Sequence, residues 1–279
     1  MSLKSLEALI NHSGSAGKRL IFPNALDSLI SLQGSHKSIH RGFLIRSRTR
    51  WFAPSSLSCQ GNFMLLSDLV LFIDGEAIVV DKPAGLPVDE PRRGGESIVS
   101  RLDELRAGFK RTPTPMHRLD QDTSGCLLLA RTPKARAELQ QLFEGRKVEK
   151  HYLAVIGGEI DLEQGTIEVP LAKRSSAEAG WKMVADPKGQ TAITNWRRIA
   201  VRDGSTLVEF IPVTGRTHQI RAHAREAFGS GIIGDRVYGI PRGPMLLHAS
   251  RLVVPRVRKP TIDAAAPLPD YFGEWSDAA

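Results

Sequence analysis

The sequence predicts an α+β fold, because strand-like and helix-like segments are mixed along the chain without the regular alternation of a parallel sheet. Short apolar runs at residues 69–73 and 77–80 flank an Asp-Gly turn, which is the pattern of an antiparallel hairpin. Further strand-like runs lie at residues 126–130 and 152–156. Helical segments follow some of these strands but not others, and the chain has no internal repeat.

Two helices are predicted in the first half of this pattern. Residues 96–110 repeat apolar side chains at helical spacing. A second helix begins after Thr132, which is a suitable N-cap with Pro133 at the first helical position. Gly145 suits the C-terminal cap of that helix.

The second half continues the mixture of strands and helices. Residues 157–195 are rich in Gly, Pro and charged side chains, as in hairpins and surface loops. The alternating run at 207–213 predicts a half-buried strand, and the run at 246–254 predicts another. Between them, Thr217 can cap a helix that ends at Gly229.

Composition indicates a globular protein with a substantial core. The chain has 279 residues, 41% of them hydrophobic and 24% charged. No stretch approaches the roughly 18 apolar residues that a membrane helix needs, so we expect a soluble protein. Cys59 and Cys126 have no metal-ligand spacing, which argues against a structural zinc or a disulfide scaffold and favours the reducing cytoplasm.

The positive charge is concentrated at the N-terminus. The chain carries +8 overall, but residues 1–63 alone carry +6 and the remainder only +2. Binding of a nucleic acid would therefore depend on local basic patches. Residues 1–63 also contain 12 Ser and show poor periodicity. We expect a disordered basic tail or a leader ahead of a start at Met64, with an organellar transit segment as the alternative and one folded domain over 64–279.

Several common chemistries are excluded by missing motifs. The chain contains no GxxxxGK[ST] phosphate loop, no HExxH and no GxSxG. His218 and His223 are five residues apart, a spacing that separates them on a helix and makes a metal pair improbable. These exclusions leave one carboxylate between flanking cations, and two further basic segments, as the candidates for chemistry.

The segment 117–125 carries the strongest chemical signal. His117 and Arg118 precede the carboxylate of Asp120, and a Thr-Ser-Gly turn then leads into the strand at 126–130. Read alone, Asp120 would cap the turn and pair with Arg118. The other interpretation is a reactive carboxylate, since an ionised Asp near a guanidinium can act as nucleophile or base without a metal.

Two distant segments could complete such a site. Arg221 lies just inside a helix start beside Arg216 and His218, where backbone N–H groups favour anions. Tyr152 follows a basic run, an arrangement that either packs a core or stacks a flipped base.

The order of these segments resembles the RluA family of RNA pseudouridine synthases. The resemblance extends over residues 70–272. It rests on the segments 81–88, 117–125, 150–152, 214–223, 234–239 and 247–249. Some family members carry a small S4-type RNA-binding domain first, which residues 1–63 do not match.

The resemblance implies the pseudouridine-synthase fold, with a mostly antiparallel mixed sheet and a central catalytic cleft. Asp120 would act at C1′ or C2′ of a target uridine, whose base detaches, rotates and rejoins the sugar through C5. Tyr152 would stack on the uracil, and Arg221 would pair with Asp120. Arg118 would fill the space of the flipped nucleotide, and His117, Arg216 and His218 would contact RNA.

The expected enzyme is thus an isomerase that acts on structured RNA, either tRNA or ribosomal RNA, as a monomer without a cofactor. Two rivals stay open. One is a non-catalytic RNA-binding protein that retains the cleft, and the other is a hydrolase of N-glycosidic bonds that uses the same carboxylate.

Overall fold

The computed structural model describes residues 19–21, 64–176 and 180–278. The expectation of a tail, leader or transit segment at residues 1–63 falls outside these residues, apart from the short strand at 19–21. The described residues from Leu65 onward belong to one compact unit. None of the helices in the described ranges combines the length and the apolar character that a membrane span requires.

Strands outnumber helices in the described part of the chain, as expected for this α+β sequence. The strands are β1 (Arg19–Ile21), β2 (Val70–Ile73), β3 (Ala77–Lys82), β4 (Thr114–Pro115), β5 (Ser124–Ala130), β6 (Glu149–Gly157), β7 (Gln164–Glu168), β8 (Leu171–Ser176), β9 (Gly180–Ala185), β10 (Ile193–Arg202), β11 (Ser205–Pro212), β12 (Leu247–Val254) and β13 (Ile262–Ala265). The helices are α2 (Pro133–Glu144), α3 (Gln219–Phe228) and the 3-10 helices η1 (Leu66–Leu69), η2 (Val99–Leu105) and η3 (Asp270–Ala278).

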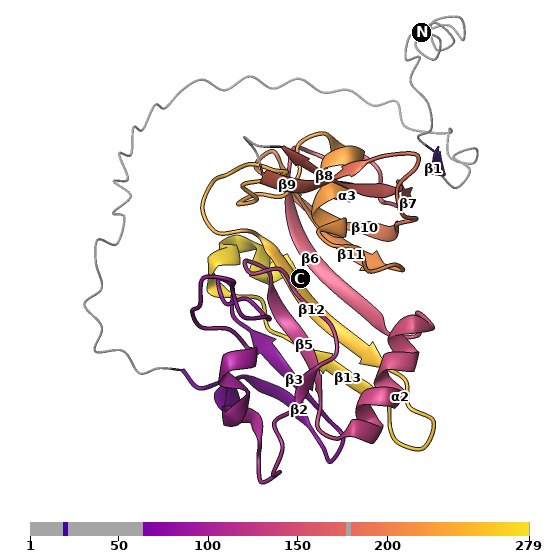
Figure 1. Ribbon diagram of the computed structural model, residues 1–279. Coiled ribbons are helices and arrows are strands. Elements are labelled where there is room, and N and C mark those ends of the chain that lie inside the picture. The colour runs from indigo at the N-terminus through magenta and orange to yellow at the C-terminus, as the bar shows by residue number, and fades with distance from the viewer. Residues whose placement is uncertain (1–18, 22–63, 177–179, 279) are drawn as a thin grey trace, which may run out of the picture. The chain divides into compact units, whose positions relative to one another are not determined.

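One large sheet organises the fold (Figure 1). Among the described strands its order is β1-β7-β10-β11-β6-β12-β5-β3-β2, with β13 beside β12 and β4 beside β5. Neighbouring strands are antiparallel except β5 and β12, which run parallel. The expected mostly antiparallel mixed sheet is therefore confirmed.

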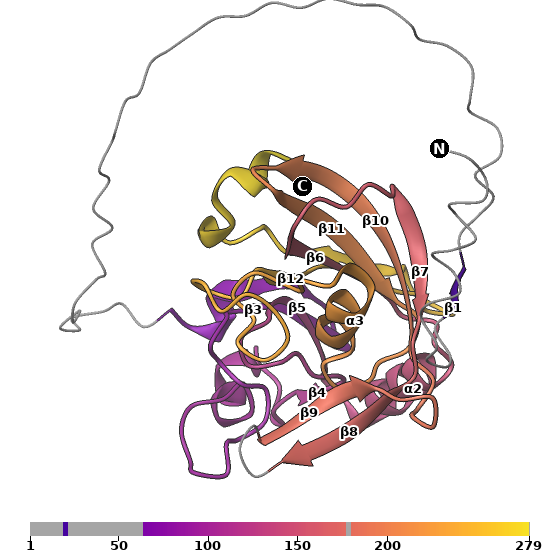
Figure 2. The same ribbon diagram turned by 90° about the horizontal axis from the view of Figure 1, so that it is seen from above.

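Both faces of the sheet are covered, which explains the continuous apolar run of β5. Leu127 and Leu129 join a core cluster with η2 and α3 on one face. Cys126 and Leu128 point to the other face and pack with Leu139 of α2. Figure 2 shows α3 between the large sheet and the β8–β9 hairpin, which forms a separate two-stranded sheet.

Most of the predicted elements are confirmed, and the differences have local causes. Thr132 caps α2 by accepting the Ala135 N–H, and Gly145 is the C-cap. The predicted helix at 96–110 is only the 3-10 helix η2, since the backbone turns to positive φ at Ala107 and Gly108. Strands β1, β4, β10 and β13 were not predicted.

The predicted cap of α3 by Thr217 is wrong. The helix begins one residue later, and its N-cap His218 has a left-handed backbone with φ of 50° and no side-chain cap. The Gln219 side chain turns back instead and accepts the Arg216 N–H at 2.9 Å. This arrangement leaves the His218 ring available for other contacts.

Candidate active site

Asp120 lies in a tight turn at the start of β5. The Thr123 N–H donates to the Asp120 carbonyl at 3.1 Å, and β5 begins at the next residue. Every residue of β5 is buried, so the turn is anchored to a rigid element. The Asp120 side chain itself keeps 26% exposure, which leaves its carboxylate accessible.

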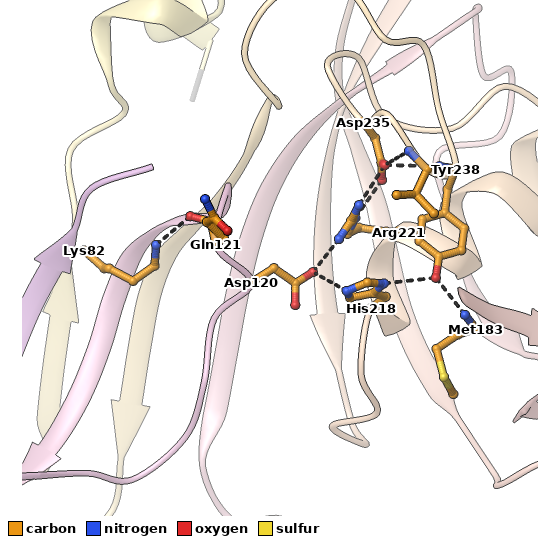
Figure 3. A network of polar contacts seen from close by, with 9 residues as sticks. Lys82, Asp120, Gln121, Met183, His218, Arg221, Asp235 and Tyr238 are labelled. Atoms are coloured by element: carbon orange, nitrogen blue, oxygen red, sulfur yellow. Dashed lines mark hydrogen bonds and ion pairs between the residues drawn. The ribbon is translucent and has the colours of Figure 1, made fainter. Parts of the chain in front are cut away.

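Arg221 of α3 connects Asp120 to a second carboxylate (Figure 3). Its Nη1 donates to Asp120 Oδ2 at 2.9 Å. Its Nε and Nη2 donate to the two oxygens of Asp235 at 2.7 and 2.8 Å. The pairing of Arg221 with Asp120 that the resemblance implied is present, and Arg118 does not take that place.

The buried ion pairs of Arg221 shift the pKa values of Arg221 and Asp235. Burial acts to lower the pKa of Arg221, but hydrogen bonds and charges of Asp235 and Asp120 outweigh it and raise that pKa. Burial likewise acts to raise the pKa of Asp235, yet the Arg221 guanidinium holds it below its usual value. A permanent positive charge therefore faces Asp120.

His218 is a second side chain that approaches Oδ2 of Asp120. Its Nε2 lies 3.8 Å from Asp120 Oδ2, and its Nδ1 lies 3.0 Å from the Tyr238 hydroxyl. Trp181 stacks on the imidazole with ring centroids 4.8 Å apart. Burial lowers the pKa of His218, the Asp120 charge opposes this, and the Arg221 charge adds to it.

Asp120, Trp181, His218 and Arg221 line a cavity of about 580 Å³. Its size is that of a small-molecule or single-nucleotide site. Cationic side chains outnumber carboxylates on its wall, which favours a polyanionic ligand such as a phosphate backbone. The lining cations are Arg118, Lys150, Arg216 and Arg221, and the carboxylates are Asp120 and Asp122.

The cavity brings together every residue that the sequence singled out: Asp120, Tyr152, Arg221, Arg118, His117, Arg216 and His218 all line it. Tyr152 projects from β6 and is almost wholly buried. Burial first, and then the Asp120 charge, raise the pKa of Tyr152, so its side chain is a neutral phenol at physiological pH.

Three further residues differ in how free they are to meet a ligand. The Arg118 side chain is 75% exposed, and its Nη1 lies 2.9 Å from Oδ2 of the exposed Asp89. Arg216 donates Nε to the Thr191 carbonyl at 3.0 Å. His117 is turned inward, where its Nε2 accepts the Leu128 N–H at 3.1 Å. Burial lowers the pKa of His117 to about 3, so this side chain is uncharged.

Sequence reasoning assigned no role to two residues that hold the site together. Asp235 binds Arg221. Lys82 is fully buried, and its Nζ donates to the carbonyls of Pro83, Leu86 and Gln121 at 2.8, 2.7 and 3.0 Å. Lys82 thus ties the loop after β3 to the residue that follows Asp120. A charged residue next to a Pro or Gly turn in a matching segment was the available signal for both.

No set of three or more His, Cys, Asp or Glu side chains within the described residues is arranged to hold a metal ion.

Comparison with known proteins shows to which family a chain with this site belongs. A family model described as RNA pseudouridylate synthase matches residues 76–226, more than half of the chain. An uncharacterized RNA pseudouridine synthase of Zymomonas mobilis is 48% identical over 212 residues, which cover 75% of this chain and 97% of the relative. The dual-specificity RNA pseudouridine synthase RluA of Yersinia pestis is 34% identical over 192 residues, covering 67% and 91% of the two chains.

Solved structures agree with the sequence relatives. Human RNA pseudouridylate synthase domain containing 4 superposes with a TM-score of 0.63 at 26% identity, covering 74% of this chain and 91% of that one. Human RNA pseudouridylate synthase domain containing 1 gives a TM-score of 0.59 at 27% identity, covering 71% and 82%. The expected pseudouridine-synthase fold is confirmed, and the chain belongs to the family of RNA pseudouridine synthases, isomerases that convert uridine in RNA to pseudouridine.

Proposed function

We propose that this isomerisation proceeds through the Asp120 carboxylate, acting on the ribose of a uridine bound in the 580 Å³ cavity. The observation that carries the proposal is the placement of Asp120 Oδ2 at 2.9 Å from Arg221 Nη1. Among the described residues, no hydrogen bond reaches Oδ1, so one oxygen is held and the other is free for the substrate.

The reaction breaks the N1–C1′ bond and forms a C5–C1′ bond, with no net oxidation. In one route, Oδ1 of Asp120 attacks C1′ and the bonding electrons leave with N1 of uracil. The base rotates, C5 attacks C1′ and the carboxylate leaves. In the other route, Asp120 removes the C2′ proton, the base departs, and the proton returns to C2′ when C5 attacks. In both, the C5 proton is lost and N1 gains one.

Tyr152 is proposed to hold the uracil ring while its sugar bond is open. The phenol is packed in the cavity wall, where its apolar face can stack on a base. A neutral phenol can accept the C5 proton only by passing on its own. We therefore assign Tyr152 to positioning of the base first, and to proton transfer only as part of a relay.

The target nucleotide has to leave its stack, because the glycosidic bond is inaccessible inside folded RNA. Extrusion costs a few kcal/mol. We propose that Arg118 offsets this cost by occupying the vacated space. Its exposed ion pair with Asp89 is of the kind that contributes only about 0–1 kcal/mol, so Arg118 is readily released.

The proposed substrate class is structured tRNA or ribosomal RNA. The names of two relatives support this: the Yersinia pestis enzyme is called dual-specificity, and a Rickettsia bellii protein 34% identical over 218 residues is called ribosomal large subunit pseudouridine synthase C. The basic wall of the cavity is compatible with either RNA.

Replacing Asp120 tests the mechanism. Asp120→Asn should abolish pseudouridine formation while the fold and RNA affinity stay unchanged, because Arg221 keeps its two hydrogen bonds to Asp235. Asp263→Asn is the matched control, since it also removes a carboxylate bound by an arginine, but on the exposed β12–β13 pair. Wild-type turnover in Asp120→Asn would refute the assignment.

The products distinguish the rival functions. Pseudouridine retained in the RNA strand supports the proposed isomerisation, and free uracil would indicate a glycosidic hydrolase. An RNA-binding protein without activity would bind target RNA and leave its uridines intact. Pseudouridine mapping of RNA from cells with and without the gene identifies the target.

A further inference from the structure

A chain of polar contacts runs from the β8–β9 hairpin to Asp120 (Figure 3). The Met183 N–H lies 2.8 Å from the Tyr238 hydroxyl, which lies 3.0 Å from His218 Nδ1. The far nitrogen of the same ring, Nε2, faces Asp120 Oδ2 at 3.8 Å. The chain thus connects a backbone amide of β9 to the proposed reactive carboxylate.

The Met183 end of this chain has a fixed direction. A backbone amide can only donate, so the Tyr238 oxygen accepts from Met183 and keeps its own proton available for donation to His218 Nδ1. A neutral imidazole whose Nδ1 accepts must carry its proton on Nε2. The His218 ring therefore presents an N–H group to Asp120.

The His218 ring is also fixed in orientation. Trp181 stacks on one face at 4.8 Å, and Tyr238 meets it edge-on at 5.6 Å. The backbone of His218 is left-handed, with φ of 50°, a region that His, Asn and Asp enter more readily than other side chains.

We propose that His218 is a positioning residue for Asp120, presented to the carboxylate as the Nε2–H tautomer by Tyr238. His218 and Arg221 both approach Oδ2, which leaves Oδ1 for the ribose. The separation of 3.8 Å is longer than a hydrogen bond, as is common for catalytic contacts before substrate binds. This role rests on the proposed function of Asp120.

Tyr238→Phe tests the relay directly. The variant keeps the ring that faces His218 and Arg221, and removes only the hydroxyl. We expect single-turnover kcat to fall by about 10- to 100-fold, the order expected for a misoriented reacting group, with KM changed by less than about twofold. Tyr271→Phe is the matched control, because it removes a hydroxyl that bonds Ser124 at 2.8 Å outside the cavity lining, and should keep wild-type kcat.

Two substitutions of His218 separate positioning from backbone conformation. An Asn amide reaches only the place of Nδ1, whereas a Gln amide extends toward the place of Nε2. If His218 serves only to adopt the left-handed backbone, His218→Asn should be the better substitute, since Asn tolerates that region. If it donates to Asp120, His218→Gln should retain more kcat than His218→Asn.

Nitrogen NMR of the His218 ring gives a readout independent of activity. We expect the Nε2–H tautomer in the wild type and loss of that preference in Tyr238→Phe. Wild-type kcat in Tyr238→Phe, or a ranking with Asn above Gln, would overturn the positioning role. If Asp120→Asn is inactive while these variants are fully active, only the role of His218 fails. If Asp120→Asn is active, the proposed function itself fails.

Discussion

Arg221 and Asp235 form a buried two-point ion pair, with N–O distances of 2.7 and 2.8 Å. The Asp235 carboxylate also accepts the N–H groups of Val237 and Tyr238, so its orientation is fixed by its own loop. Only one guanidinium nitrogen, Nη1, remains for Asp120. Asp235 therefore determines where Arg221 points, and through Arg221 it influences Asp120.

Asp235→Asn should reduce both stability and kcat. An amide can accept from Arg221 with its oxygen only, so the buried pair is broken on one side. Removing one partner of a buried ion pair costs about 3–5 kcal/mol, and retention of one acceptor places this variant toward the lower value. Chemical denaturation and single-turnover assays measure the two effects. Asp263→Asn, on an exposed pair, should change the free energy of unfolding by less than about 1 kcal/mol. Unchanged stability of Asp235→Asn would contradict the role of Asp235 in holding Arg221 toward Asp120.

Arg118→Ala should weaken RNA binding without altering the fold. Its side chain is 75% exposed, and its pair with Asp89 contributes little to stability. If Arg118 meets a phosphate or the space of the flipped base, the dependence of log K on log salt concentration should become shallower by about 0.7 for single-stranded RNA. Asp89→Asn frees Arg118 and should tighten binding slightly. Equal salt dependence in wild type and Arg118→Ala would exclude a phosphate contact by this residue.

The arrangement of the candidate site could be predicted from the sequence because its residues lie in short segments whose order carries information. Asp120 and Arg221 are 101 positions apart, yet the resemblance implied their pairing, and the structure places them 2.9 Å apart. The strand at 126–130 could be predicted because burial on both faces demands a continuous apolar run.

The supporting network could not be predicted, since it depends on loop conformation. Tyr238 receives its partner from β9, in a segment that sequence reasoning described only as hairpins and loops. The role of His218 depends on a left-handed backbone that Gln219 stabilises, whereas a standard cap by Thr217 was expected. Lys82 binds three backbone carbonyls, and no side-chain pattern reports such partners.

His248 should make stability depend on pH. This side chain is fully buried, with Nδ1 2.9 Å from Ser124 Oγ and Nε2 3.3 Å from the Ala266 carbonyl. Burial lowers its pKa to about 4. Below pH 6.5 the unfolded chain takes up a proton that the folded chain excludes. The stabilisation is therefore complete above pH 6.5 and is lost as the pH falls toward 4, by about 3 kcal/mol.

Urea unfolding between pH 7 and pH 4 measures this loss. His248→Gln should be less stable at pH 7, by about 1–3 kcal/mol for the lost hydrogen bonds, but its stability should fall less steeply with acid. His117 contributes in the same direction, so some slope should persist in the variant. Parallel curves for wild type and variant would show that His248 is protonated equally in both states.

Gly125→Ala should destabilise β5, the strand that follows the turn containing Asp120. Gly125 has φ of +107°, and an added Cβ would lie 2.2 Å from the Ala249 carbonyl oxygen on the parallel neighbour β12. Strain and overpacking together should lower the free energy of unfolding by about 2–6 kcal/mol. Gly85→Ala is the matched control, because its φ of +86° is equally unfavourable but no atom lies within 4 Å of the added methyl group. It should lose only the about 1–3 kcal/mol that the unfavourable backbone conformation costs.

Activity should follow the same order, since only Gly125→Ala separates β5 from β12 next to the turn that contains Asp120. Equal losses in the two variants would show that close packing of these strands does not position the carboxylate.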